Sequence, residues 1–318
     1  MKILIVDDDP DILEILAALL ETFGYRDISQ AQSGAQALEI INEAPQAFDL
    51  LLLDIQMPRM TGVELCKQIR TLAAYQYSPI IMVTAMSDKA HIDEAFAAGA
   101  TDYITKPIDF AELKHRVSLA EKASFQAQQL AHNAMAQGQP GGSAGSVATI
   151  ALSDAIPIDD VIGVLRVHAF ENYLHQMNRL QFGSTKIQIL TVTNIGSIYE
   201  RCSSRDFVGV VTDIAECLSD SLREHTPLIT YFGRGIFGIA VTGHMQKTAA
   251  DITAGMYRQV EDAGLVFCDG CPVPITVETF DIEKSTFYSS NSQIDFIDRL
   301  LRELKMAAHV ETSMAQTL

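Results

Sequence analysis

The chain has 318 residues and 48% hydrophobic content, enough for about two domains with a core each. Residues 1–125 carry nineteen acidic and ten basic side chains, net −9, and the remainder carries twenty-one and thirteen, net −8. Because basic contacts to phosphates supply most of the affinity for duplex DNA, this acidic balance in both halves argues against DNA as a partner.

The chain also lacks the marks of export or membrane insertion. Its opening, MKILIVDD, has one Lys and then a strand-like pattern, without the long apolar core and small-residue cleavage site of a signal peptide. No apolar stretch approaches membrane-spanning length. The five cysteines form no paired framework, which fits a reducing compartment. We therefore expect a soluble, cytoplasmic protein without membrane insertion.

The first 122 residues alternate short apolar runs with helix-sized segments. Unbroken apolar runs of this kind are typical of strands buried on both faces of a parallel sheet, and helices between them imply a doubly wound α/β fold of five strands. Asp9-Pro10 opens the first helix as a cap followed by a first-turn proline. The expected strands are 3–6, 27–31, 50–53, 80–83 and 101–105, and the expected helices are 10–23, 34–44, 63–72, 88–98 and one from 108.

Polar side chains follow four of these runs directly. They are Asp7 and Asp8, Asp54, Thr84, and Lys106. Because the carboxyl ends of parallel strands form the ligand-binding edge of an open α/β sheet, we expect all of them in one pocket. Clustered carboxylates repel one another unless a cation lies between them, and an all-oxygen ligand set favours Mg²⁺. Mg²⁺ and the Lys106 ammonium together could neutralise a phosphoryl group that arrives on one carboxylate.

The segments VDDDP, LLLLDIQMPRMTG, IIMVTA and YITKP, all within residues 1–122, resemble the receiver domain of two-component response regulators. The resemblance implies a flavodoxin-like fold, phosphorylation of Asp54 by a histidine kinase or phosphotransfer protein, and a cis bond before Pro107. It also implies that Mg²⁺ is held by Asp7, Asp8, Asp54 and the backbone carbonyl of Gln56. Phosphate would contact Thr84 and Lys106. Tyr103 would be the switch aromatic, although a half-buried strand tyrosine explains that residue equally well.

Two readings remain open for the segment that follows. No Gly or Pro occurs from Ala111 to Ala136, which favours one long helix projecting from the domain, while a helix that frays after about residue 122 is the alternative. Residues 138–146 are rich in Gly, Pro and Ser and read as a flexible linker. We assign 1–122 to a receiver domain, 123–155 to the helical extension and linker, 156–307 to an output domain and 308–318 to a tail.

The output domain reads as an α+β sheet with helices on one face, in the ferredoxin-like class. A hairpin turn is expected at Phe232-Gly233-Arg234-Gly235-Ile236, with Arg234 as a solvated turn residue. The expected helices are 160–181, 206–224, 247–263 and 293–307, and the expected strands are 187–193, 228–233, 236–242 and a pair around 265–280.

The hairpin and the strand after it, GRGIFGIAVTG, resemble the GGDEF domain of diguanylate cyclases, as do the opening helix with Asp159 and Gly163 and the strand ILTVTNIGSI. Cyclases of that family join two nucleotide triphosphates with two metal ions held by carboxylates. Here the positions of those carboxylates carry other residues. The inhibitory Arg-x-x-Asp motif is also missing, because the residue three positions after Arg223 is Thr226. The replacements are Thr191, Gly235 and Ile236 at metal-ligand positions, Arg166 in place of an Asn, and Val208 in place of an Asp. We therefore expect the fold without the chemistry, and no enzymatic activity.

Several alternatives remain for this half. One is a divergent cyclase that uses other carboxylates, such as Asp206 or Asp213, and another is a sensor that binds GTP or cyclic di-GMP without turnover. Cys268-Asp-Gly-Cys271 reads as a hairpin with two small buried thiols, with a redox or intermolecular metal role as the alternative. The preferred hypothesis is a response regulator that signals by binding a downstream protein partner or a second copy of itself.

Overall fold

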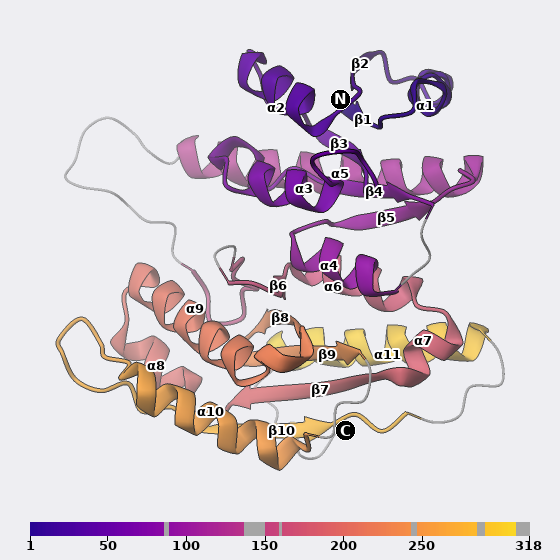
Figure 1. The fold of residues 1–318 in the computed structure, drawn as a ribbon. Coiled ribbons are helices and arrows are strands. Elements are labelled where there is room, and N and C mark those ends of the chain that lie inside the picture. Colours follow the sequence, from indigo (N-terminus) through magenta and orange to yellow (C-terminus); the bar gives the residue numbers. More distant parts are fainter. Residues whose placement is uncertain (86–88, 137–149, 159–160, 243–246, 285–289, 310–318) are drawn as a thin grey trace. The chain divides into compact units, whose positions relative to one another are not determined.

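The computed structural model describes residues 1–318 apart from 86–88, 137–149, 159–160, 243–246, 285–289 and 310–318. The chain divides into two compact units, Met1–Ala144 and Gly145–Leu318, which are considered one at a time below (Figure 1). Among the described helices, none has both the length and the apolar character that crossing a bilayer requires. The Gly/Pro/Ser-rich segment 138–146, most of the expected tail and Asp159 lie outside the described residues.

The first unit has the alternating order expected from its apolar runs. Its strands are β1 (Lys2–Val6), β2 (Asp27–Ala31), β3 (Leu50–Asp54), β4 (Ile80–Thr84) and β5 (Asp102–Thr105). Its helices are α1 (Pro10–Thr22), α2 (Gly34–Glu43), α3 (Gly62–Arg70), α4 (Lys89–Ala97) and α5 (Phe110–Ala136), with a short 3-10 turn at Ala73–Tyr75. All strands pair in parallel in the order β2-β1-β3-β4-β5, so the prediction of a five-stranded parallel sheet is confirmed.

Helices cover both faces of this sheet. α1 and α5 pack on one face through residues such as Leu16 and Val117, and α2, α3 and α4 pack on the other through residues such as Ile41 and Ile69. β3 and β4 are buried at every position, which explains why their sequences run apolar without alternation.

Local capping sets where the helices begin. Asp9 caps α1 by accepting a hydrogen bond from the Asp11 N–H, and Pro10 follows it in the first turn. Thr61 and Glu64 form a capping box at the start of α3, the helix that follows the Asp54 loop. These caps fix the paths by which the chain leaves β1 and β3.

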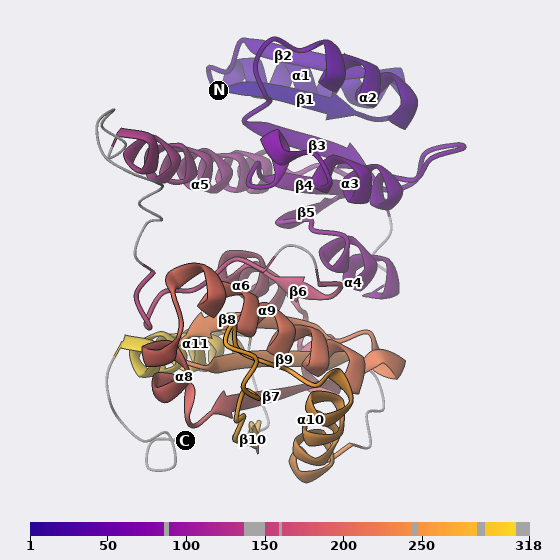
Figure 2. The ribbon, with the colours of Figure 1, turned by 90° about the vertical axis from the view of Figure 1, so that its left-hand side faces the viewer.

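α5 is a single helix to Ala136, so fraying after residue 122 is not what the structure shows. Leu113, Val117 and Ala120 are buried against the sheet. Figure 2 shows α5 continuing beyond the strands that it covers. The absence of Gly and Pro from this stretch removes the usual helix breakers.

The second unit contains a separate five-stranded mixed sheet. Its strands are β6 (Val164–Leu165), β7 (Thr185–Val192), β8 (Leu228–Gly233), β9 (Ile236–Thr242) and β10 (Val277–Asp281), in the order β10-β7-β9-β8-β6. Its helices are α6 (Val167–Gln176), α7 (Arg179–Ser184), α8 (Ile195–Arg201), α9 (Ser204–Ser221), α10 (Ala249–Ala263) and α11 (Ser290–His309), with a 3-10 turn at Arg223–His225. β7, α8–α9, β8, β9, α10 and β10 follow one another in βαββαβ order.

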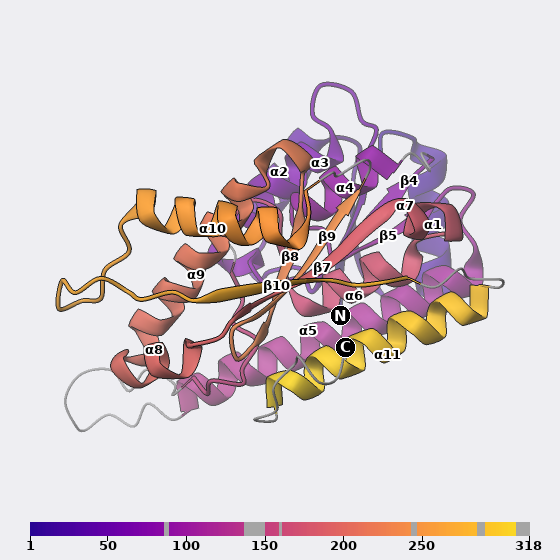
Figure 3. The same ribbon diagram turned by 90° about the horizontal axis from the view of Figure 1, so that it is seen from below.

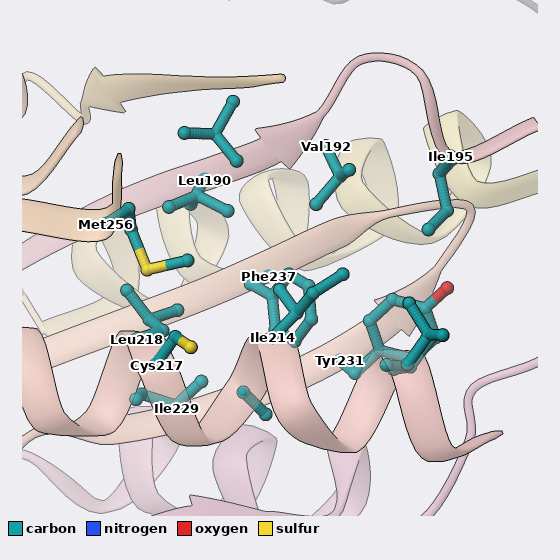
Figure 4. Packing of buried hydrophobic residues seen from close by; sticks show 14 of the residues in the cluster. Leu190, Val192, Ile195, Ile214, Cys217, Leu218, Ile229, Tyr231, Phe237 and Met256 are labelled. Atoms are coloured by element: carbon teal, nitrogen blue, oxygen red, sulfur yellow. The ribbon is translucent and has the colours of Figure 1, made fainter. Parts of the chain in front are cut away.

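Helices cover both faces of this sheet as well, and the expectation of helices on one face is wrong. α9 and α10 pack on one face, where Leu190, Phe237 and Ile214 meet (Figure 4). α6 and α11 contact β8 on the opposite face (Figure 3). There the Phe170 ring meets that of Phe232, with ring centroids 6.2 Å apart. The sequence order of the elements does not reveal which face each terminal helix covers.

Other boundaries in the second unit differ from the sequence prediction. The expected helix 160–181 is instead β6 followed by two helices, because Gly163 has φ +81° and the chain then pairs with β8 in parallel. Asn178 caps the second of these helices. α8 was not predicted, and the expected strand pair around 265–280 is one isolated bridge, Val266 with Pro272, followed by β10.

Candidate functional site

The parallel sheet of the first unit brings the polar ends of four strands to one edge. Asp7 and Asp8 follow β1, Asp54 ends β3, Thr84 ends β4 and Lys106 follows β5. β1 pairs with β3, β3 with β4 and β4 with β5, all in parallel, so these ends are adjacent. The Lys106–Pro107 bond is cis, as expected.

Lys106 links the two buried carboxylates. Its Nζ lies 2.7 Å from Asp7 Oδ2 and 2.8 Å from Asp54 Oδ1. The carboxylate side chains are 1% and 4% exposed, whereas that of Lys106 is 19% exposed. One ammonium cannot balance both buried carboxylates, and removal of Lys106 would leave two uncompensated negative charges.

Asp8 completes a set of three carboxylates. One oxygen from each of Asp7, Asp8 and Asp54 lies within 4.8 Å of the others, and Asp8 is the exposed member. Asp7 Oδ1 also accepts a hydrogen bond of 3.0 Å from the Asp9 N–H. Three carboxylates balanced by one ammonium leave an excess of negative charge, and oxygen ligands on a solvent-facing edge fit Mg²⁺.

Burial opposes ionisation of the candidate phosphoacceptor. Burial is the largest effect on Asp54 and raises its pKa, and the neighbouring charge of Asp7 raises it further. The hydrogen bond and charge of Lys106 lower this pKa, as does a hydrogen bond from the Gln56 backbone N–H, but the net pKa remains above the usual value. A divalent cation among the carboxylates would favour the ionised form.

The same pair of carboxylates acts on the ammonium. Burial would lower the pKa of Lys106, but its hydrogen bonds to Asp54 and Asp7 outweigh burial and raise it. Lys106 therefore carries a full positive charge next to Asp54 throughout the physiological range.

The remaining predicted residues surround this cluster. Thr84 is fully buried, and its carbonyl accepts a 2.7 Å hydrogen bond from the Lys106 N–H. Gln56 is exposed, two residues after Asp54. Tyr103 is half-buried on β5, where burial raises its pKa to about 12 and its ring packs edge-on at 6.3 Å from Phe96.

Two residues contribute to this region in ways that the sequence analysis did not assign: Gly62, in the loop 56–62 that the sequence places beside the acceptor, and Asp102. A Cβ on Gly62 would lie 2.1 Å from the Asp54 carbonyl oxygen, so only glycine allows the loop after β3 to pass this close. Asp102 is buried at the start of β5 and pairs with Arg116 of α5 at 3.2 Å. The Thr61-Gly62 dipeptide in the sequence could have indicated the role of Gly62. No sequence pattern indicates the pairing of Asp102 with Arg116, because helical or strand periodicity does not relate the two positions.

In the second unit the positions singled out from sequence carry no carboxylate pair. Thr191 of β7 lies opposite Ile236 of β9 in the strand register, and Gly235 is part of the hairpin turn. Arg234 is not a solvated turn residue, because its Nε donates a 3.2 Å hydrogen bond to the carbonyl of Ala308 in α11. Among the described residues, the group Asp7, Asp8 and Asp54 is the one set of His, Cys, Asp or Glu that could hold a metal ion.

The alternative carboxylates of this unit both lie on α9. Asp206 is in the first turn of α9, where its backbone N–H is capped by Ser203, and Asp213 lies further along the same helix. Cys268 and Cys271 are free thiols flanking a turn at Gly270. Both are exposed, so the expectation that they are buried is wrong. The Cys268 thiol hydrogen-bonds to Asp206, and the negative carboxylate raises the thiol pKa.

Comparison with known proteins identifies the first unit. The response regulator receiver domain family matches residues 3–118. The transcriptional regulatory protein YvrH of Bacillus subtilis is 38% identical over 132 residues, which is 42% of this chain and 54% of YvrH. The signal transduction histidine-protein kinase BarA of Escherichia coli K12 is 38% identical over 122 residues, 38% of this chain and 13% of BarA.

A solved structure is also similar to part of the chain. The response regulator receiver domain protein (CheY-like) from Methanospirillum hungatei JF-1 is 33% identical, with 40% of this chain and 97% of that chain covered and a TM-score of 0.36. The chain thus spans about half the length of YvrH and a smaller part of BarA. Residues 3–118 are a response regulator receiver domain, a module of two-component signalling.

Proposed function

We propose that this chain is a response regulator in which Asp54 accepts a phosphoryl group from a sensor histidine kinase or a phosphotransfer protein. The observation that carries the proposal is the Asp7–Lys106–Asp54 cluster at the carboxyl edge of the sheet, with Asp8 beside it. A carboxylate oxygen of Asp54 attacks phosphorus as the bond from phosphorus to the histidine nitrogen breaks. The electron pair of that bond stays on the imidazole nitrogen, which takes a proton from solvent.

The residues around Asp54 have separate roles in this transfer. Lys106 pairs with the oxygens of the incoming phosphoryl group, and the Thr84 hydroxyl at the end of the neighbouring strand is a further donor. Asp7, Asp8, Asp54 and the Gln56 carbonyl would hold Mg²⁺. When bound, that ion neutralises charge on the transferring group. The family model and the oxygen-only carboxylate set support this assignment.

Transfer from a small phosphodonor tests the acceptor. Incubation of the full chain with acetyl phosphate and Mg²⁺ should add one phosphoryl group to the intact mass. Asp54→Asn should abolish the addition, and Asp11→Asn, on the exposed first turn of α1, should leave it unchanged. An unaltered acid-labile phosphate in the Asp54 variant would refute the assignment.

Phosphorylation then shifts a population of conformations. Thr84 and its loop move toward the phosphoryl group, Tyr103 follows, and the surface of α4, β5 and α5 changes its affinity for a partner. Tyr103 lies on that surface between Phe96 of α4 and the Arg116–Asp102 pair of α5 and β5.

For the second unit we propose a ferredoxin-like fold of GGDEF type that has lost catalysis and binds a downstream protein or a second copy of the chain in the cytoplasm. The βαββαβ order, with β9 between β7 and β8, supports the fold. Thr191, Gly235 and Ile236 at the expected metal positions support the loss of chemistry, because two-metal catalysis needs carboxylates there. Although YvrH is named a transcriptional regulator, the net charge of −8 favours a protein partner over DNA.

Two measurements separate this proposal from its alternatives. Incubation with GTP and Mg²⁺ should yield no cyclic di-GMP, and its formation would favour a divergent cyclase. Calorimetric titration with GTP and with cyclic di-GMP should give no heat of binding, and saturable binding without turnover would favour a nucleotide sensor.

A further inference from the structure

Arg70, the last residue of α3, holds three backbone carbonyls with one guanidinium group. Its Nε and Nη2 donate to the carbonyl of Gly99 at 2.9 and 2.7 Å. Its Nη1 donates to the carbonyls of Tyr75 and Ser78 at 2.6 and 2.8 Å. Gly99 belongs to the turn after α4, whereas the other two residues precede β4. Because the guanidinium plane fixes the directions of its N–H groups, these four bonds hold the turn and the segment before β4 in one arrangement.

The turn after α4 also packs directly against α3. Gly99 has φ +98°, and a Cβ there would lie 2.9 Å from Cγ and from Nε of Arg70. The thiol of Cys66, one helical turn earlier on α3, donates a 3.3 Å hydrogen bond to the carbonyl of Ala98. Two side chains of α3 therefore fasten the end of α4.

This attachment lies at the edge of the sheet opposite the phosphoacceptor. α4 starts after the carboxyl end of β4, which carries Thr84, and it ends before the amino end of β5. The Thr101 N–H and hydroxyl donate to the carbonyl of Ile80, the first residue of β4, at 2.8 and 2.9 Å. Since the parallel strands all run in one direction, the fastened end of α4 and Asp54 lie at opposite edges of the sheet.

Burial is uneven along α4 in the same sense. Ala95, Phe96 and Ala98 are buried, whereas among residues 91–94 the structure describes one buried side chain, that of Ile92. Segments with few buried contacts are displaced more readily than segments that are packed into the core. The first half of α4 can therefore move while its end remains in place.

We propose that the turn 98–101, held by Arg70, is a fixed pivot about which α4 tilts when Asp54 is phosphorylated. This inference rests on the proposed function, in which Thr84 and its loop move toward the phosphoryl group. That movement displaces the start of α4, while the bonds from Arg70 keep the turn 98–101 against α3. Arg70 is thus a positioning residue that converts a shift beside Thr84 into a rotation of the helix. A partner that distinguishes the phosphorylated chain therefore contacts the first half of α4.

Amide NMR signals of the full chain, recorded with and without excess acetyl phosphate and Mg²⁺, test the pivot. In the unaltered chain, phosphorylation should shift the signals of residues 91–94 and leave those of residues 99–101 within their line width. In Arg70→Met the signals of residues 99–101 should shift as well, because the turn is no longer held. Lys67→Met removes a cationic side chain at an exposed position of the same helix and should behave like the unaltered chain.

A second variant separates the geometry of the guanidinium from its charge. Arg70→Lys keeps the charge without the planar group and should release the turn as Arg70→Met does. Dispersed signals of β4 in each variant report that the domain is folded, and the intact mass of each sample reports phosphorylation. A chain that takes no phosphoryl group would overturn the proposed function and the pivot together. Complete phosphorylation with equal shifts at both ends of α4 in the unaltered chain, or with an unshifted turn in both Arg70 variants, would overturn the pivot alone.

Discussion

Lys106 sets the balance of charge at the phosphoacceptor. A single ammonium lies within 2.8 Å of two buried carboxylates, and a third carboxylate lies beside them. Attraction to Lys106 offsets only part of the cost of burying Asp54, since the pKa of Asp54 stays above its usual value. Negative charge at the site therefore remains partly uncompensated. A bound cation, or a phosphoryl group that arrives with its cation, can compensate it.

The first residue-scale prediction concerns that unrelieved charge. Asp54→Asn removes a buried charge and should raise the stability of the receiver domain by about 1 kcal/mol without Mg²⁺. Millimolar Mg²⁺ should stabilise the unaltered protein and have little effect on the variant, because ligand binding to the folded state adds stability. Urea unfolding followed by NMR signals of β4 measures both. A variant less stable than the unaltered chain would show that Lys106 compensates the charge fully.

A second prediction at this scale is a pH dependence from Asp102. Burial, the largest cause, raises its pKa to about 6, although Arg116 lowers it, whereas an unfolded Asp titrates near about 4. Between these values the folded state binds a proton that the unfolded state does not, so stability falls as pH rises through this window and stays lower above it. The loss amounts to about 3 kcal/mol at most.

The variant Asp102→Asn isolates this dependence. It should flatten the fall in receiver-domain stability between about pH 4 and 6, measured by urea unfolding at several pH values. Asp11→Asn, at an exposed position in the first turn of α1, should retain the fall. An equal slope in Asp102→Asn and the unaltered chain would mean that Asp102 does not titrate in this window.

At the scale of elements, the loop from β3 to α3 positions the acceptor. The Gly62 N–H donates a 3.0 Å hydrogen bond to the Ile55 carbonyl, and the Thr61–Glu64 capping box then starts α3. Arg59 in this loop has φ +72°, a conformation that few non-glycine residues adopt. The loop therefore bends sharply back over the end of β3 and fixes the backbone beside Asp54.

Substitution of Gly62 tests this role. In Gly62→Ala the added Cβ meets the Asp54 carbonyl oxygen at 2.1 Å, so the backbone at the acceptor must shift. We expect a loss of about 2 kcal/mol or more in receiver-domain stability and slower labelling by acetyl phosphate. Gly34→Ala is a matched control, because its Cβ meets the flexible side chain of Met60, which can move aside. Equal effects of the two substitutions would contradict this explanation.

At the scale of the whole molecule, the two units differ in what their sheets present. The receiver sheet presents three carboxylates and a lysine at one edge, whereas the hairpin tip of the second unit presents glycines and an arginine bonded to its own chain. Phosphoryl chemistry therefore belongs to the first unit in our proposal, and binding belongs to the second.

Partial restoration of the second unit should not create an enzyme. Gly235→Asp with Ile236→Glu would rebuild two carboxylates at the turn, but Thr191 opposite Ile236 would still provide no third one. Two-metal catalysis requires ligands that hold both ions at a fixed separation, so the double variant should form no cyclic di-GMP from GTP and Mg²⁺. Adding Thr191→Asp gives a matched triple variant that supplies the third carboxylate. Turnover by the double variant would show that Thr191 is not the limiting position.

The sequence by itself determined most of the receiver domain. Unbroken apolar runs such as Leu50–Leu53 specified buried parallel strands, and the polar residues directly after them specified the site, because strand direction brings carboxyl ends to one edge. Periodicity and capping residues, such as Asp9 before Pro10, placed the helices within a few residues. Local chemistry and local periodicity carry this information.

Only the tertiary structure decided features that join distant parts of the chain. These include Asp102 paired with Arg116, Gly62 under the Asp54 carbonyl, the two-sided covering of the second sheet, and Leu152 bonded to Arg234. Each of these features depends on contacts between residues whose spacing in the sequence follows neither the helical period nor the strand period. A pattern read along the chain reports which face is apolar, but packing in three dimensions selects what covers that face.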